Sequence, residues 1–192
     1  MVSESIVKAS KSLLSADLNL AEEVIATDVR IDDYQHELDA RIIDIIARQQ
    51  PVASDLRALV TALRMSADLE RMGDLAHHVA KLVRLRHPAS AVPAELLALV
   101  EVIGETAEKI ATKTGVVIST RDVALAAQVE KDDDEMDMLH RKLISTLVEP
   151  SWPHGVETAI DLTLLGRYYE RYADHAVSVA RRVIFLVTGK FA

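Results

Sequence analysis

The feature of this sequence that most constrains its fold is an internal repeat. When residues 69–83 are placed over residues 169–183, seven of the fifteen positions are identical. A second block repeats at a shift of 105 residues instead of 100, and it pairs residues 17–32 with residues 122–137. Both blocks occur in the same order, so the chain is predicted to be a duplicated three-helix unit. The change of shift predicts that the last connection of the second unit is five residues shorter.

Prolines divide the chain into long stretches with helical spacing. The five prolines fall at positions 51, 88, 93, 150 and 153, and proline interrupts a helix interior. Valine, isoleucine and threonine rarely alternate with polar residues, so we predict no sheet. Ser54 is the strongest N-cap candidate, and Asn19, Asp122 and His154 also lie near helix starts. The apolar spacing predicts helices near residues 1–14, 18–49, 54–86, 94–118, 122–148 and 155–188.

The two predicted repeats, residues 1–88 and 93–192, differ at their beginnings. The helix that starts near Pro93 maps, at a shift of 105, to a position before Met1. The first helix is therefore expected to be shorter than its counterpart by roughly three turns. We expect that the chain is truncated or begins at an internal start codon, and that part of the groove of the first bundle is uncovered.

Composition excludes several classes of site and partner. The chain has no cysteine, so any metal must be held by Asp, Glu or His. Its 30 acidic and 22 basic residues give a net charge of −8, which argues against a nucleic-acid partner. The first residues lack a signal pattern, and no apolar run approaches the roughly 20 residues of a membrane span. We expect a cytoplasmic protein, with a peripheral role at the membrane left open.

Four pairs of acids spaced four residues apart are the strongest candidates for a binding site. This spacing places both carboxylates of a pair on one helix face, where like charges repel by a few tenths of a kcal/mol. A bound cation would reverse that sign, and carboxylate oxygens suit Mg²⁺, Mn²⁺ and iron. The predicted metal ligands, at positions related by the repeat, are Asp28, Asp32, Glu70, Asp74, Asp133, Asp137, Glu170 and Asp174.

Helical geometry predicts where these acids face. Asp28 and Asp32 lie beside the apolar stripe of their helix, whereas Glu70 and Asp74 lie opposite the apolar face of residues 69–83. We therefore expect carboxylates at the rim or in solvent, not a buried ferritin-like centre. Acids at this spacing are common on solvated helix faces, and that interpretation remains the alternative for any single pair. Their recurrence in both repeats favours a metal-related role.

Neighbouring polar residues have simpler interpretations. His36, His77, His78 and His140 follow the acids at ligand spacing, but Val177 and Ser178 replace the histidine pair in the second repeat, so solvated or capping histidines are expected. Arg71 and Arg171 are expected to form salt bridges with adjacent acids. Packing roles with polar tips are expected for Tyr168, Tyr169 and Tyr172.

Motifs of the common enzyme classes are missing from the sequence. There is no P-loop, no glycine-rich dinucleotide turn and no G-x-S-x-G segment. The paired Glu-x-x-His segments of carboxylate di-iron oxidases are also missing. The sequence therefore predicts that the protein is not an enzyme and has no organic cofactor.

Four segments resemble the hallmark segments of PhoU proteins, most closely those of actinobacteria. They are residues 55–57, 69–76, 133–137 and 169–176. The resemblance implies two pseudo-symmetric three-helix bundles and a homodimer. It also implies multinuclear metal clusters, of iron or of Mn, Mg or Zn, with one site at Asp28, Asp32, Glu70 and Asp74 and the other at Asp133, Asp137, Glu170 and Asp174.

The resemblance further implies negative regulation of phosphate uptake and of the phosphate-starvation response. The expected partners are the ATPase subunit of a phosphate ABC transporter and a sensor histidine kinase, which would hold the protein at the membrane. Two other functions remain open. One is a carboxylate-bound metal-handling protein or ferritin-like metalloenzyme, and the other is a helical scaffold whose acids are only solvated.

Overall fold

The computed structural model describes residues 1–190, which form six α-helices and one short 3₁₀ helix. No strand occurs among these residues. The all-α prediction is confirmed, and every helix lies within a few residues of its predicted range. The helices are α1 (Val2–Ser15), α2 (Leu18–Gln49), α3 (Ala53–Arg86), α4 (Leu97–Thr120, preceded by η1, Ala94–Leu96), α5 (Val123–Leu147) and α6 (Gly155–Thr188).

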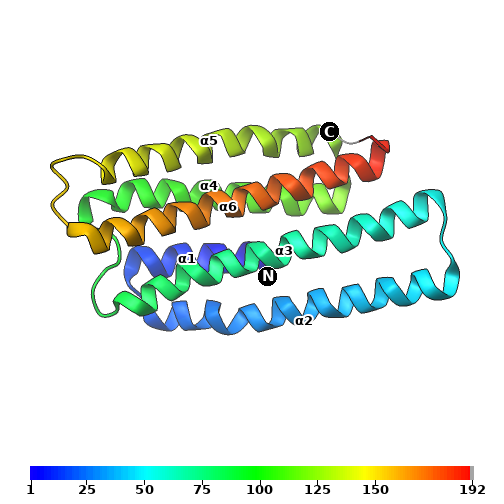
Figure 1. Cartoon of the computed structure of the whole chain (residues 1–192), viewed down its shortest axis with the longest axis horizontal. Helices are drawn as coiled ribbons and strands as arrows, with labels where there is room; N and C mark the ends of the chain where they lie inside the picture. The colour runs from blue at the N-terminus through cyan, green and yellow to red at the C-terminus, as the bar shows by residue number, and fades with distance from the viewer. Residues whose placement is uncertain (191–192) are drawn as a thin grey trace.

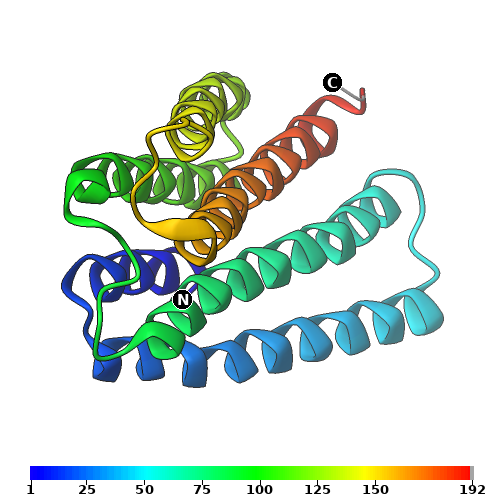
Figure 2. The same ribbon diagram turned by 60° about the vertical axis from the view of Figure 1, so that its left-hand side comes forward.

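The helices form two three-helix bundles that lie against each other (Figure 1). One bundle contains α1 to α3 and the other contains α4 to α6. Contacts between the bundles are made by α3 with α6 and by α1 with α4. Helices α2 and α5 therefore lie on the two outer sides of the molecule, as both views show (Figures 1 and 2). This arrangement confirms the predicted pair of three-helix bundles.

Both bundles contribute to one hydrophobic core. Small residues such as Ala76 of α3 and Ala176 of α6 are fully buried, which lets the long helices approach closely. Tyr169 is fully buried, and its hydroxyl lies 2.8 Å from Ser10 Oγ of α1. Tyr172 is also buried, and it donates to the carbonyl oxygen of Val2 at 3.4 Å. Both tyrosines thus pack as predicted, with polar tips that reach the other bundle.

Aspartates begin the two outer helices. Asp122 caps α5 by accepting hydrogen bonds from two backbone N–H groups, which confirms its predicted position near a helix start. Asp17 plays the same role for α2, where its carboxylate accepts from the N–H of Leu20 at 3.1 Å. Asn19 is the second residue of that helix, near its start as predicted. A cap of this kind stabilises a helix by about 1 kcal/mol.

The prediction that Ser54 caps the third helix is wrong. Helix α3 begins at Ala53, so Ser54 already lies in its first turn. The cap position is taken by Val52 in an extended conformation, and Val52 cannot offer a side-chain oxygen. His154 occupies the cap position of α6 but makes no capping bond there, and its ring contacts Glu95 instead.

The two repeats differ in length at two places. Helix α1 has 14 residues and its counterpart α4 has 24. Beside α1, the first bundle has a mainly apolar pocket of about 160 Å³ lined by Val2, Ile31, Leu38 and Leu69, among others. The expectation of a shorter last connection is wrong, because segment 148–154 is longer than segment 50–52. The residues are lost from the helix, since α5 has 25 residues and α2 has 32.

Within residues 1–190, none of the helices combines the length and the apolar character that crossing a bilayer requires.

Two glycines of α4 provide a test of the contact between α1 and α4. A Cβ on Gly115 would meet nothing within 4 Å, whereas a Cβ on Gly104 would lie 3.0 Å from Ser10 of α1. Alanine is favoured over glycine in a helix by about 1 kcal/mol. We therefore expect Gly115→Ala to raise the free energy of unfolding by about that amount, measured by denaturant titration.

Gly104→Ala has the same helix preference but must push α1 away, and overpacking costs about 1–3 kcal/mol. We expect it to be less stable than Gly115→Ala by about that cost. Equal stability of the two variants would mean that α1 and α4 do not approach as closely as described.

Candidate metal centre

The eight predicted acids form two clusters, one in each bundle. Helix spacing brings two acids from each of two neighbouring helices to a shared face. We call them the first acid cluster, between α2 and α3, and the second acid cluster, between α5 and α6. The first contains Asp28, Asp32, Glu70 and Asp74, and the second contains Asp133, Asp137, Glu170 and Asp174.

Mutual repulsion is visible in the first acid cluster. Burial raises the pKa of Glu70; Arg71 opposes this shift, and the charges of Asp74, Asp32 and Asp28 add to it. Burial also raises the pKa of Asp32, with further contributions from Asp28 and Asp74. Acids from α2 and α3 therefore sense one another across the helix pair.

A histidine joins the first acid cluster at its most buried point. Asp28, Asp74 and His77 each offer one ligand atom, and these three atoms lie within 4.8 Å of one another. Asp28 is only 8% exposed, and one of its oxygens contacts His77 Nδ1. The other oxygen, Asp28 Oδ1, and His77 Nε2 are buried without a hydrogen-bond partner.

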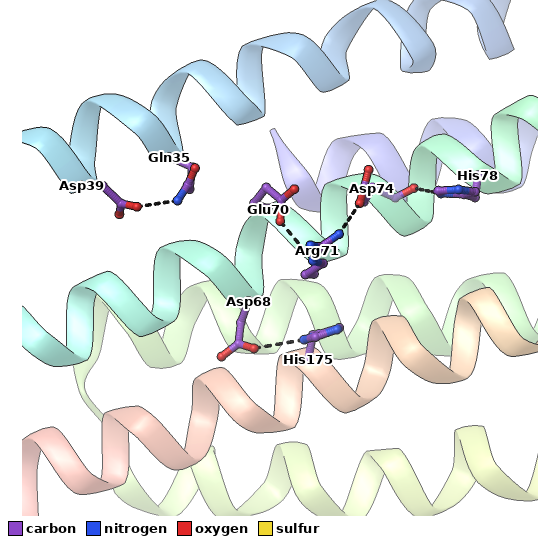
Figure 3. A network of polar contacts seen from close by, with 8 residues as sticks. All are labelled: Gln35, Asp39, Asp68, Glu70, Arg71, Asp74, His78 and His175. Carbon is purple, nitrogen blue, oxygen red and sulfur yellow. Dashed lines mark hydrogen bonds and ion pairs between the residues drawn. The ribbon is translucent and has the colours of Figure 1, made fainter.

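Two predictions about these residues are therefore wrong. Asp28 was expected at the rim, but α3 packs over the apolar stripe beside it and buries it. His77 was expected in solvent or as a cap, but it points from α3 toward α2 and contacts Asp28. His78 is likewise neither solvated nor a cap, because it is half-buried in the middle of α3, where its Nδ1 lies 2.6 Å from the backbone oxygen of Asp74 (Figure 3) and its ring packs on Tyr168.

The second acid cluster shares this charge pattern but has a different centre. Burial raises the pKa of Asp133 to about 6, with added repulsion from Asp174 and Asp137. Asp133 Oδ1 is buried without a hydrogen-bond partner, like Asp28 Oδ1 in the first acid cluster. Within residues 1–190, however, no trio of ligand atoms apart from that of Asp28, Asp74 and His77 lies so close together.

Arginines account for part of this difference. Arg167 binds both oxygens of Glu170, at 2.5 and 2.6 Å. In the first acid cluster, Arg71 lies between Glu70 and Asp74 (Figure 3). Its Nε is 3.5 Å from a carboxylate oxygen of Glu70, and its Nη1 is 2.9 Å from one of Asp74. Arg171 is 3.8 Å from Asp174. The salt bridges expected for Arg71 and Arg171 are thus present, and such exposed pairs are weak enough for a cation to displace them.

The donor atoms fit a hard or borderline cation. Metal–ligand distances are roughly 2.0–2.6 Å, so ligand atoms on opposite sides of one ion lie about 4–5 Å apart. The separation of up to 4.8 Å in the first trio meets that condition. An ion in the first acid cluster would give a partner to the orphaned atoms of Asp28 and His77, and an ion in the second would do so for Asp133. Carboxylates with one imidazole suit Mg²⁺, Mn²⁺, iron or Zn²⁺.

Sequence reasoning missed the ion pairs that join the bundles near the clusters. Asp68 of α3 binds Arg182 of α6 at 2.7 Å and faces His175 at 3.0 Å (Figure 3). At the C-terminal end of α3, Arg86 binds Asp161 at 2.5 Å and Glu157 at 2.6 Å. The seven-residue spacing of His175 and Arg182, two helical turns, was the available signal, but it names no partner on another helix.

The raised pKa of Asp133 gives a pH-dependent prediction for the metal-free protein. Its ordinary pKa is 3.8 and its folded value is about 6, so the folded state binds the proton more tightly. The free energy of unfolding should therefore fall as pH rises from about 4 to 6. We expect Asp133→Asn to stabilise the protein at pH 7 by about 1 kcal/mol, a value reduced for solvent screening, and to have little effect at pH 4.

Thermal unfolding in EDTA at both pH values would measure this difference. Glu37→Gln, which alters an exposed carboxylate of α2, is the control and should change stability little at either pH. The interpretation fails if Asp133→Asn destabilises the metal-free protein at pH 7.

Comparisons with known proteins agree with this architecture. A sequence model of the PhoU domain matches residues 1–83 and 100–183. Phosphate-specific transport system accessory protein PhoU homolog 2 of Mycobacterium tuberculosis is 47% identical over 96% of this chain and 86% of its own length. Homolog 1 of Mycobacterium leprae is 48% identical over 96% of this chain and 83% of its own length.

Solved structures extend the similarity to the fold. The crystal structure of PhoU from Pseudomonas aeruginosa has a TM-score of 0.85 and 29% identity, covering 98% of this chain and 91% of that one. A regulatory PhoU from Streptococcus pneumoniae has a TM-score of 0.88 at 23% identity, covering 100% of this chain and 90% of that one. With both repeats matched and mycobacterial relatives similar along nearly its whole length, the chain belongs to the PhoU family.

Proposed function

We propose that this protein is a regulatory accessory protein of a phosphate transport system, and that it restrains phosphate uptake and the phosphate-starvation response. The observation that carries the proposal is its similarity to the two mycobacterial PhoU homologs, which are named as phosphate-specific transport system accessory proteins. Each alignment covers 96% of this chain and more than four fifths of the relative. From relatives that are similar along nearly the whole chain, we therefore infer that this protein regulates a phosphate transport system.

The mechanism we propose is that of an adaptor. The helical faces dock on the ATPase subunit of a phosphate ABC transporter and on a sensor histidine kinase, and the protein works in the cytoplasm as a homodimer. The long outer helix α2 supports this role, because it exposes large apolar residues to solvent. Val29, Tyr34 and Ile43 are each more than half exposed. Apolar groups on an outer helix suit contacts with another protein.

A bound metal is proposed to stabilise or tune these surfaces. The first site would use Asp28, Asp32, Glu70 and Asp74, with His77 as an added ligand. The bound metal would be a multinuclear iron cluster, or Mn, Mg or Zn. The orphaned buried atoms and the raised pKa values of these clustered, partly buried acids support the proposal. Neutralising the repulsion between α2 and α3 would hold the two helices in a fixed register. The second site would use Asp133, Asp137, Glu170 and Asp174.

Metal handling is the alternative function, and the trio of Asp28, Asp74 and His77 favours it. A carboxylate metalloenzyme or ferritin-like iron handler would oxidise or store iron at these acids. The regulatory proposal needs no catalysis by this chain. A metal-dependent oxidase or hydrolase activity that is lost in Glu70→Ala or Glu170→Ala would favour the alternative.

Gene deletion with complementation tests the regulatory proposal. We expect deletion to turn on phosphate-scavenging genes in phosphate-rich medium, measured by transcript abundance. The wild-type gene should restore repression. A variant with all eight acids of the two clusters changed to Asn or Gln should restore less, if metal tunes the docking surfaces.

The control is Glu37→Gln, which removes a single exposed carboxylate outside both clusters. Unchanged expression after deletion would contradict the regulatory role. Full repression by the eight-acid variant would keep the adaptor but reduce the clusters to solvated faces, as in the scaffold alternative.

A further inference from the structure

An arginine-lined pocket opens between the first half of α3 and the last half of α6, outside both acid clusters. Its volume is about 180 Å³. A water molecule occupies about 30 Å³ in the liquid, so the pocket has room for an anion of a few heavy atoms together with solvent. Both helices contribute polar and apolar residues to its lining. The lining includes Thr61, Arg64, Ser178, Arg181, Arg182 and Phe185.

The charges around this pocket do not cancel. Arg182 binds Asp68 at 2.7 Å, and Arg181 binds Glu130 of α5. Arg64 forms no ion pair with any residue in the described range 1–190. The guanidinium of Arg57 adds further positive charge, because it lies 5.7 Å from the ring of Phe185 in the pocket wall. The region is thus locally positive, although the whole chain carries a net charge of −8.

Donor groups remain available after these pairs are formed. A guanidinium has five N–H donors. Asp68 contacts Nε of Arg182, and Glu130 contacts Nη2 of Arg181, so each arginine keeps other donors. Burial raises the pKa of Asp68, but hydrogen bonds from His175 and Arg182 outweigh it and bring the pKa below its usual value. Asp68 therefore stays ionised and anchors Arg182 in place.

The repeat provides an internal comparison. At a shift of 100, Arg57 corresponds to Glu157 and Thr61 corresponds to Asp161. At that end of the helix pair the acids are satisfied from within the chain, because Arg86 binds both of them. The counterpart of Arg86 is Leu186, which offers no charge. Within the described residues 1–190, the basic end therefore has no charged residue in the place of Arg86, and its acids Asp68 and Glu130 each pair with one arginine and leave Arg64 without an ion pair.

We propose that this pocket binds a phosphate group, either inorganic phosphate or the phosphate of a phosphomonoester. Guanidinium groups bind phosphate oxygens through paired hydrogen bonds, and several converging arginines suit a tetrahedral anion with more than one negative charge. Arg64 and Arg181 are the recognition residues, and Arg182 is positioned by Asp68. The inference does not depend on the regulatory role, since it is drawn from the residues of the pocket and not from the mycobacterial relatives. None of these residues belongs to an acid cluster.

Calorimetric titration of the full chain with inorganic phosphate and with phenyl phosphate tests the proposal. EDTA is present so that phosphate cannot bind through a metal, and ionic strength is held low and constant because salt screens exposed charges. The wild type should bind at least one of the two with 1:1 stoichiometry. Tighter binding of inorganic phosphate would identify the free anion, and tighter binding of phenyl phosphate a phosphomonoester.

Arg64→Gln/Arg181→Gln removes the recognition residues and leaves the pair of Asp68 and Arg182 intact. We expect it to raise the dissociation constant by about tenfold or more, since charged hydrogen bonds are lost. The control is Arg48→Gln/Arg84→Gln, which removes two exposed arginines elsewhere with the same change of net charge, and it should bind as the wild type does.

Two results would overturn the proposal. One is the lack of saturable binding of either anion to the wild type. The other is equal weakening in both double variants, which would reveal only a general effect of charge. Thermal unfolding of each variant, recorded beside the titrations, verifies that all the compared proteins are folded.

Discussion

The packing of α3 against α6 is the contact on which the rest of the structure depends. Each helix has 34 residues, and buried alanines let the two approach closely along their length. Ion pairs fix their register, with Asp68 bound to Arg182 near the middle of α3 and Arg86 bound to Asp161 at its C-terminal end. Because one face of each helix is committed to this contact, the remaining faces present acids to α2 and α5.

Duplication explains why the molecule has two acid clusters, and divergence explains why they differ. Both clusters hold carboxylates that repel one another, and each contains a buried oxygen without a hydrogen-bond partner. The first adds His77, whereas in the second Arg167 occupies both oxygens of Glu170. The same divergence placed arginines at one end of the pair of α3 and α6 and acids at the other. A repeated fold can thus carry different ligand chemistries at related positions.

Much of the fold could be predicted from the sequence, because the apolar spacing of helices, the prolines and the repeat are all visible in the order of residues along the chain. The pairs of acids within each helix were also predictable, since the repeat retained them, whereas their grouping across two helices was implied only by the resemblance to PhoU proteins. Contacts between helices could not be predicted from the sequence. The burial of Asp28 and the direction of His77 depend on how α3 packs over α2, and the partner of Asp68 lies more than a hundred residues away. Ser54 failed as a cap because α3 begins one residue earlier than predicted.

We propose that the two acid clusters are metal sites, and metal content tests this proposal most directly. Protein purified without an affinity-tag metal would be analysed by elemental mass spectrometry, beside Glu70→Ala/Asp74→Ala, Glu170→Ala/Asp174→Ala and the variant that combines all four changes. We expect near-stoichiometric iron, manganese or zinc in the wild type, partial loss in each double variant and complete loss in the combined one. A wild type without metal, or metal retained by the combined variant, would contradict it.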